Sequence, residues 1–412
     1  MRRHKALLTL TMLMRMGGGL ASLFLLARAL GPGDYGVVAT VFAYAAIVTL
    51  VTDFGFSVTL LRDVGAEPGR AGAIMAECLR IKNLLSALAA LLALAALVAG
   101  RPDAAMFWSS VMLFGAVMVL SYGELALTGL RALGRYEVEL AVVAAGTAAL
   151  AMILGGAALA FAHILPMAIA VLLARSIQTG LAFAALAKFV RLGNCLVGPV
   201  RRPLRNGAGM AGDTVLTALS GQIDVILVSS LLGFHAAGTY QVAIRAASYV
   251  MMPSQVLSGI YTPALSAHHF AADSEARTLE ARMRREFPLA GAVLGGFLAA
   301  AMPMLAPWIF GHAFTVPLDI WAGLGALVFV RFSTGALGIA LVARRAVKTR
   351  LLGQGLGVSV LVVGLLSVLP VAGLSAAPWI AVAGAVTTAA IYALALRRVG
   401  QETRPAVIPA GE

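Results

Sequence analysis

Charged residues are scarce in this sequence. Asp, Glu, Lys and Arg together make up 12% of its 412 residues, whereas hydrophobic residues make up 60%. A soluble protein of this length needs many more polar side chains to cover its surface. The mean hydropathy of +0.93 and the unbroken apolar runs instead indicate helices that span a phospholipid bilayer. The sequence therefore predicts an all-α polytopic membrane protein.

Cysteine and histidine are also rare, with two and six residues. Cys78 and Cys195 lie in expected polar connections and lack the spacing of a disulfide framework or a metal site. A Walker-type phosphate loop is missing as well, so ATP is not indicated as the energy source. The histidines lie at or beside expected helix ends without the spacing of metal ligands: His4, His163, His235, His268, His269 and His312. We therefore expect no catalytic residues, no metal and no cofactor, and a protein that is not an enzyme.

Acidic residues are outnumbered, with 18 Asp and Glu against 31 Lys and Arg and a formal net charge of +13. In a soluble chain this excess would indicate a nucleic-acid partner. Here 25 of the 31 cations fall in every second connection between apolar segments, and the connections of the other side hold Arg28 and Arg101. Because positive charge near helix ends is retained in the cytoplasm, we expect both termini to be cytoplasmic and no nucleic acid to be bound.

Twelve apolar segments are long enough to cross the hydrocarbon as helices, which takes about 20 residues. Together they predict twelve transmembrane helices in two groups of six. The expected spans are 6–29, 36–60, 81–100, 105–129, 139–162, 164–188, 208–232, 236–263, 287–310, 316–342, 351–372 and 377–396.

The longest polar connection separates the first six segments from the last six. It contains Pro199, Pro203 and a cluster of arginines, as a joint between two parts would. The expected parts are an N-terminal six-helix lobe 1–188, a basic cytoplasmic linker 189–207, a C-terminal six-helix lobe 208–396 and a cytoplasmic tail 397–412.

A short internal repeat follows the first span of each half. Residues 30–36 read Leu-Gly-Pro-Gly-Asp-Tyr-Gly, and residues 232–240 read Leu-Gly-Phe-His-Ala-Ala-Gly-Thr-Tyr. In both, Leu-Gly ends a helix, a short loop follows, and a tyrosine, Tyr35 or Tyr240, precedes the next span. The two turns occupy equivalent points of two halves with the same orientation. This favours a parallel repeat with two pseudo-symmetric lobes and a substrate site at their interface.

These features together resemble the polysaccharide flippases of the multidrug/oligosaccharidyl-lipid/polysaccharide superfamily, the Wzx-type O-antigen and exopolysaccharide transporters. The resemblance rests on the length, the twelve spans and the two turns at 30–36 and 232–240. It implies a V-shaped, MATE-like pair of six-helix lobes in a bacterial cytoplasmic (inner) membrane. It further implies a lipid-linked oligosaccharide as substrate, held by its pyrophosphate in a cationic cavity. Glycan polymerases or glycosyltransferases of the same pathway are the implied protein partners.

Four arginines within the expected spans are candidates for substrate binding. An arginine at mid-bilayer costs ~2.5–3.5 kcal/mol on insertion scales, so it calls for a partner, water or a ligand. A rise of about 1.5 Å per residue places Arg15 level with Asp53, and Asp224 level with Arg245. We interpret Arg15 and Arg245 as the halves of a phosphate clamp. Asp53 and Asp224 would serve as their counter-ions or as ion-coupling residues, and the alternative is two ion pairs that only make the helices insertable.

Arg331 and Arg175 are further candidates for substrate binding, with ordinary helix-packing contacts as the alternative. Glu124, Asp213 and Asp319 lie close to expected helix ends. Their side chains can reach the interface from there. We therefore expect these three acids to be solvated.

Glycine and proline interrupt two helices that the repeat places at the lobe interface. Such residues weaken or bend a helix, although small residues also allow close packing between membrane helices. The candidate hinge residues are Gly17, Gly18, Gly19 and Pro253.

Two functions remain open at this stage. The first is a flippase for undecaprenyl-pyrophosphate-linked oligosaccharide that works by alternating access. The second is a proton- or sodium-coupled exporter of small organic cations, as in the related MATE branch, with Asp53 and Asp224 as ligands. The excess of arginines over acids in the spans favours an anionic substrate.

Overall fold

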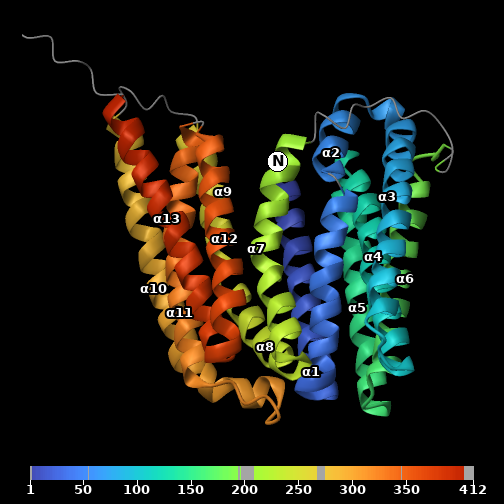
Figure 1. The fold of residues 1–412 in the computed structure, drawn as a ribbon. Coiled ribbons are helices and arrows are strands. Elements are labelled where there is room, and N and C mark those ends of the chain that lie inside the picture. Colours follow the sequence, from blue (N-terminus) through green and yellow to red (C-terminus); the bar gives the residue numbers. More distant parts are fainter. Residues whose placement is uncertain are drawn as a thin grey trace, which may run out of the picture. The chain divides into compact units, whose positions relative to one another are not determined.

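The computed structural model describes residues 2–53, 55–193, 195, 208–266, 274–344 and 346–402. This described part of the chain is built of α-helices and one short 3-10 helix, without a strand (Figure 1). The chain is a multi-pass membrane protein, and the predicted all-α class is confirmed. Most of the expected linker 189–207, from residue 196 onward, and the tail beyond residue 402 lie outside the described residues.

Most helices follow the expected spans, since apolar length fixes them, but α1 covers the first span and most of the second, and α3 and α10 begin ten and thirteen residues early. Among the described residues, nine helices are long and apolar enough to cross a membrane. The helices are α1 (Arg2–Asp53), α2 (Phe56–Ala66), α3 (Ala71–Ala99), α4 (Ala104–Ala132), α5 (Tyr136–Ala160), α6 (Ile164–Ala187), α7 (Ala208–Leu232), α8 (Phe234–Val250), α9 (Pro253–Ser266), α10 (Ser274–Phe310), α11 (Leu318–Ala343), α12 (Val347–Ala372) and α13 (Ala376–Glu402).

The second expected span of each half is broken within its length. The span 36–60 stops at Asp53, and the chain resumes as α2 after Gly55, whose φ is +74°. The span 236–263 stops at Val250 and resumes at Pro253, which has no N–H to continue a helical ladder. The interruption at Pro253 is thus confirmed, whereas the break after Asp53 was not predicted.

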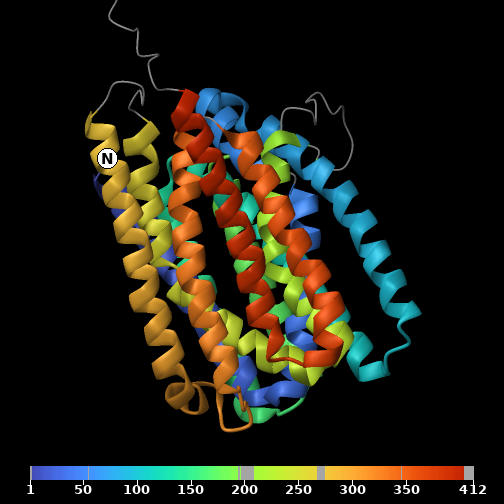
Figure 2. The same cartoon turned by 60° about the vertical axis from the view of Figure 1, so that its left-hand side comes forward.

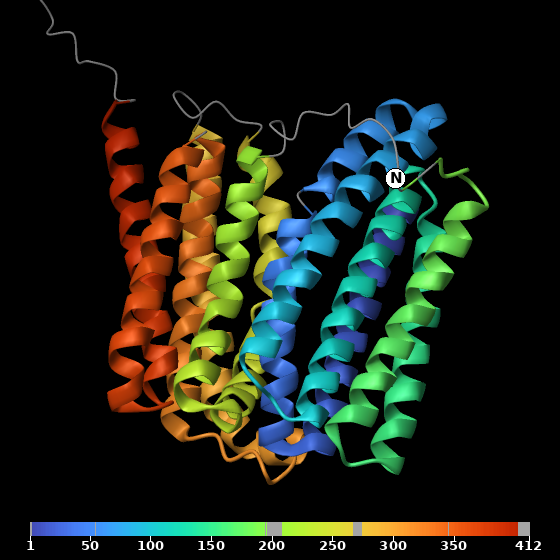
Figure 3. The same ribbon diagram turned by 45° about the vertical axis from the view of Figure 1, so that its right-hand side comes forward.

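The contacts divide the chain into two units. The first comprises Met1–Ser229 with two short segments, Phe234–Gly238 and Ile309–Ala313. In it α4 packs along α6, and α5 packs along both α1 and α6. Figure 3 shows the helices α4, α5 and α6 side by side, in teal and green. This packing brings side chains of four helices together inside the unit.

The second unit comprises Ser230–Gly233, Thr239–Trp308 and Phe314–Glu412. Its helix α13 packs along α11 and α12, the orange and red ribbons of Figure 2. Glycines permit these close crossings. A Cβ at Gly357 would lie 2.7 Å from the carbonyl oxygen of Gly384, so backbone meets backbone there.

The repeated turns match in conformation as well as in sequence. Gly31 has φ +68° and ψ 177°, and Gly233, 202 residues later, has φ +86° and ψ 174°. Glycine adopts such a positive φ at little cost. With this offset Tyr240 is the counterpart of Val38 rather than of Tyr35. The repeat is therefore carried by the glycines, and the pairing of the two tyrosines was wrong.

The two turns also contact each other, within the first unit. A Cβ added to Gly36 would lie 1.7 Å from the carbonyl oxygen of Phe234. One added to Gly238 would lie 2.0 Å from the carbonyl oxygen of Pro32. At the 202-residue offset Gly36 corresponds to Gly238, and Pro32 corresponds to Phe234. The same pair of positions is therefore in contact in both directions. We call these two turns, residues 31–36 and 233–238, the glycine crossing.

Candidate functional site

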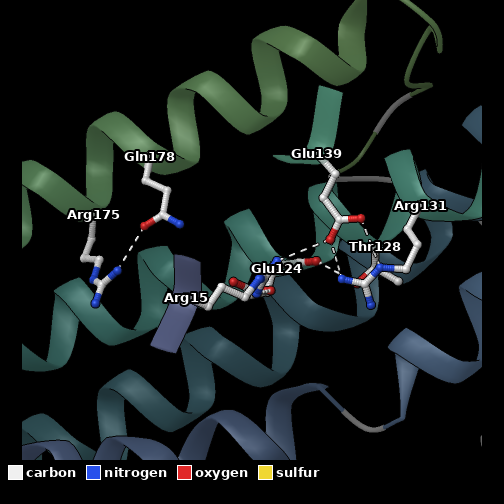
Figure 4. A network of polar contacts seen from close by, with 7 residues as sticks. All are labelled: Arg15, Glu124, Thr128, Arg131, Glu139, Arg175 and Gln178. Atoms are coloured by element: carbon white, nitrogen blue, oxygen red, sulfur yellow. Dashed lines mark hydrogen bonds and ion pairs between the residues drawn. The ribbon is translucent and has the colours of Figure 1, made fainter. Parts of the chain in front are cut away.

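Charged side chains from three helices of the first unit meet inside the apolar spans (Figure 4). Helix α1 contributes Arg15, α4 contributes Glu124 and Arg131, and α5 contributes Glu139. We call these four residues the arginine–glutamate network. Arg175 of α6 lies beside it in the same view and hydrogen-bonds Gln178 one helical turn later.

Glu139 is the centre of this network. Its side chain is fully buried, and its Oε2 accepts a hydrogen bond from Arg131 Nε at 3.1 Å while Oε1 accepts one from Arg131 Nη2. Arg15 Nη2 lies 3.5 Å from the same Oε1. A buried carboxylate remains charged only when it is paired in this way. Glu139 therefore ties α1, α4 and α5 together.

Arg15 also donates a hydrogen bond from Nη1 to Glu124 Oε2. Both side chains are partly accessible, Arg15 at 28% and Glu124 at 36%. The sequence-based pairing of Arg15 with Asp53 is therefore wrong. The expectation that Glu124 is simply solvated at a helix end is also wrong, because α4 continues to Ala132 and packs against α1.

Asp53 has a different partner, Lys82 of α3. The Lys82 ammonium donates hydrogen bonds to Asp53 Oδ1 and, at 2.5 Å, to Ser121 Oγ of α4. Lys82 is completely buried, although the sequence placed it at the very start of the span 81–100 and its charge was counted with the cytoplasmic connection. Cys78, also expected in a connection, is buried on the same helix. Helix α3 begins ten residues earlier than expected, at Ala71, which explains both errors.

The two arginines expected in the second half have no acidic partner among the described residues. With its carboxamide oxygen turned toward Arg245, Gln241 accepts hydrogen bonds from Arg245 Nε at 2.8 Å and Nη2 at 3.3 Å. Arg331 lies midway along α11, partly exposed, and has no hydrogen-bonding partner among the residues that the structure describes. No carboxylate of the described residues therefore pairs with either guanidinium group.

The remaining acids show no common pattern. Asp224 is buried in the first unit, where its Oδ1 accepts the backbone N–H of Val225 at 2.8 Å. Because Arg245 belongs to the second unit, its pairing with Asp224 stays a prediction. Asp319 is exposed in the first turn of α11, as expected. The side chain of Asp213 lies outside those that the structure describes.

The glycine triplet does not bend α1 in this structure. The helix is regular through Gly17, Gly18 and Gly19, and its one residue with non-helical dihedral angles is Gly31. A Cβ on Gly18 would lie 2.9 Å from Cγ2 of Thr147 on α5. Gly18 thus serves close helix packing here, while hinge motion at the triplet and at Pro253 stays a prediction.

Three arginines of the spans have no acidic hydrogen-bonding partner among the residues that the structure describes. Arg175 and Arg245 hydrogen-bond to neutral carboxamides, and Arg331 has no partner within the described part of the chain. Sequence reasoning found all three arginines but missed the buried ions Lys82 and Glu139 and the partly buried Arg131 that pairs with Glu139. A signal for Glu139 was present, since it lies eight residues after Arg131 across a short turn.

A model of the family described as polysaccharide biosynthesis protein matches residues 3–268. A search of curated proteins gives no significant match.

Solved structures with similar folds cover nearly the whole chain. One is an inward-facing multidrug resistance MATE family transporter of the MOP superfamily, with a TM-score of 0.74 and 13% identity over 95% of this chain and 96% of that one. Another is the lipid II flippase MurJ in an inward closed conformation, with a TM-score of 0.71 and 10% identity over 95% of this chain and 87% of that one. A third is a MOP superfamily transporter from Pyrococcus furiosus, described as having a binding pocket of reverse polarity, with a TM-score of 0.63 and 15% identity over 98% and 96%.

Proposed function

Because the chain belongs to the polysaccharide biosynthesis protein family of the MOP superfamily, we propose that it is a flippase for a lipid-linked oligosaccharide in a bacterial cytoplasmic membrane. The lipid carrier we propose is undecaprenyl pyrophosphate, and the exported glycan is an O-antigen or exopolysaccharide unit. Alternating access by two lobes, 1–188 and 208–396, would carry it from the cytoplasmic to the outer leaflet. Both termini would be cytoplasmic, and enzymes of the same pathway would supply the substrate.

One observation carries this proposal: the spans contain arginines that form no ion pair with an acid of the described residues. Arg245 and Arg331 lack acidic partners among the described residues, and Arg175 contacts a neutral carboxamide. A pyrophosphate offers several oxygens to such groups, and guanidinium binds them in pairs. Holding a net positive charge in an apolar span is costly unless a ligand or water compensates it. An anionic headgroup would provide that compensation.

Arg15 would take part by exchanging partners. Its Nη1 pairs with Glu124, which is itself 36% exposed, so this pair is accessible to a competing anion. A pyrophosphate that reached Arg15 would displace Glu124, whereas Glu139 would remain held by Arg131. Arg15 and Arg245 would then form the two sides of the clamp. The acids would restore the empty state after release.

The second candidate is a MATE-like exporter of small organic cations. The exposed fractions of the Asp53 and Glu124 side chains, 38% and 36%, favour it, because each could receive a cation. Both carboxylates already pair with Lys82 or Arg15, however. A cationic substrate would have to displace a resident cation and approach the remaining arginines. The balance of charge therefore favours the anionic substrate.

The decisive experiment measures flipping of a fluorescent pyrophosphate-linked oligosaccharide in proteoliposomes. We expect Arg15→Ala, Arg245→Ala and Arg331→Ala each to lower the rate at least tenfold. Arg398→Ala is the matched control, since this arginine is exposed at the end of α13, and it should leave the rate unchanged. No flipping by the native protein, together with pH-driven efflux of an organic cation, would establish the exporter instead.

A further inference from the structure

Lys82 combines three properties that a purely structural lysine does not need together. It is completely buried, its ammonium faces oxygen atoms of two other helices, and those oxygens lie at the break between α1 and α2. Asp53 is the last residue of α1, where the helix dipole presents its negative end. The ammonium therefore occupies a position with negative potential from a carboxylate and a helix terminus at once.

The hydroxyl of Ser121 is oriented as a cation ligand. Ser121 Oγ donates its hydrogen to Asp53 Oδ1 at 2.9 Å, so its lone pairs are free to face Lys82 Nζ at 2.5 Å. The ring of Tyr122 lies 5.0 Å from the same nitrogen, at a distance where a cation is attracted to an aromatic face. Two hard oxygens and an aromatic ring would suit an alkali cation as well as an ammonium ion.

The carboxylate side of this arrangement is open, although the lysine is not. The Asp53 side chain is 38% exposed, whereas the Lys82 side chain is 0% exposed. A cation from solution could thus reach Asp53 without crossing the packed core. Lys82, which belongs to α3, already occupies this position.

We propose that the Lys82 ammonium is the resident cation of an alkali-cation site formed by Asp53, Ser121 and Tyr122. The native protein therefore needs no Na⁺ or K⁺ at this point, because the cation is covalently attached. When the lysine side chain is removed, the site takes up an alkali cation from solution. This inference does not depend on the proposed substrate.

The test compares thermal unfolding of full-length variants in detergent, in NaCl, KCl and N-methylglucamine chloride at equal ionic strength. We expect Lys82→Ala to gain about 3–5 °C in Tm when Na⁺ or K⁺ is raised to roughly 100 times its Kd, since a ligand stabilises the state that binds it. The native protein and the double variant Asp53→Asn/Lys82→Ala should show no difference between the salts. Binding of ²²Na⁺ should follow the same order among the three proteins.

Ser121→Ala added to Lys82→Ala supplies a second measurement. It should weaken the salt effect, because one of the two oxygens is lost. Equal Tm values for Lys82→Ala in all three salts would overturn the proposal, and so would a salt effect that survives in Asp53→Asn/Lys82→Ala. If Lys82→Ala fails to fold in every salt while the double variant folds, the pair is only a structural ion pair, and the proposal is likewise overturned.

Discussion

The two units share the same glycine turn but treat their buried charges differently. In the first unit Arg15, Arg131 and Lys82 each contact a carboxylate within the spans. In the second unit Arg245 and Arg331 contact none among the described residues. Acids near the ends of its helices are paired instead, as in the contact of Glu280 with Arg344 at 2.7 Å. The ion pairs of Arg15, Arg131 and Lys82 thus join helices of the first unit, whereas Arg245 and Arg331 form no ion pair within the described part of the chain.

Removing the central acid of the first unit should have the largest effect on stability. Glu139→Gln leaves Arg131 and Arg15 without their shared carboxylate in the apolar interior. Breaking one side of a buried ion pair costs about 3–5 kcal/mol. We expect a Tm lowered by several degrees, measured by thermal unfolding in detergent. Glu137→Gln, two residues away and exposed, is the control, and an equal loss in both variants would contradict the central role of Glu139.

A methyl group in the glycine crossing should have the next largest effect. In Gly238→Ala the new Cβ would lie 2.0 Å from the carbonyl oxygen of Pro32, a backbone atom that cannot move aside alone. Forcing an extra carbon into a packed site costs typically 1–3 kcal/mol. Gly33→Ala belongs to the same pair of turns but has nothing within 4 Å of its Cβ. If both substitutions lower the Tm equally, the crossing is not a close contact in the protein.

Replacing a charge of the second unit should separate stability from transport. Arg331→Met removes no ion pair within the described structure, so we expect the free energy of unfolding to change by less than about 1 kcal/mol. Flipping in proteoliposomes should nevertheless fall at least tenfold. Arg131→Met, which breaks the contact with Glu139, should destabilise the protein clearly. A large stability loss for Arg331→Met would remove the contrast between the two units.

An exposed pair outside the spans should have the smallest effect. Arg62 Nε donates a hydrogen bond to Asp63 Oδ1 at 2.8 Å, and this carboxylate raises the pKa of Arg62. Arg62 is charged at neutral pH with or without that shift, and water screens the pair. We expect Arg62→Ala to leave the Tm unchanged within error between pH 6 and pH 9. A measurable loss would mean that the Arg62–Asp63 pair contributes more to the fold than its exposure suggests.

The sequence predicted the helices well because apolar length and Gly-Pro turns are local signals. It predicted the partners of the charges poorly because packing between helices decides them. Glu124 faces Arg15 only because α4 packs against α1 and continues to Ala132. The polar start of α3 concealed that this helix begins at Ala71 and that Lys82 is buried on it, and the apolar run around residue 54 concealed the break after Asp53.

The glycine crossing also defines which residues of the two halves correspond, because it sets the offset between them at 202 residues. Counting 202 residues back from Arg245, along helices that are unbroken from Gly36 and Gly238, leads to Ala43, which is fully buried. The substitution Ala43→Arg therefore places an arginine in the N-terminal half at the position that corresponds to Arg245 in the C-terminal half. Near the two turns, each residue of one half therefore has a defined counterpart in the other, and the two can be exchanged and compared by substitution.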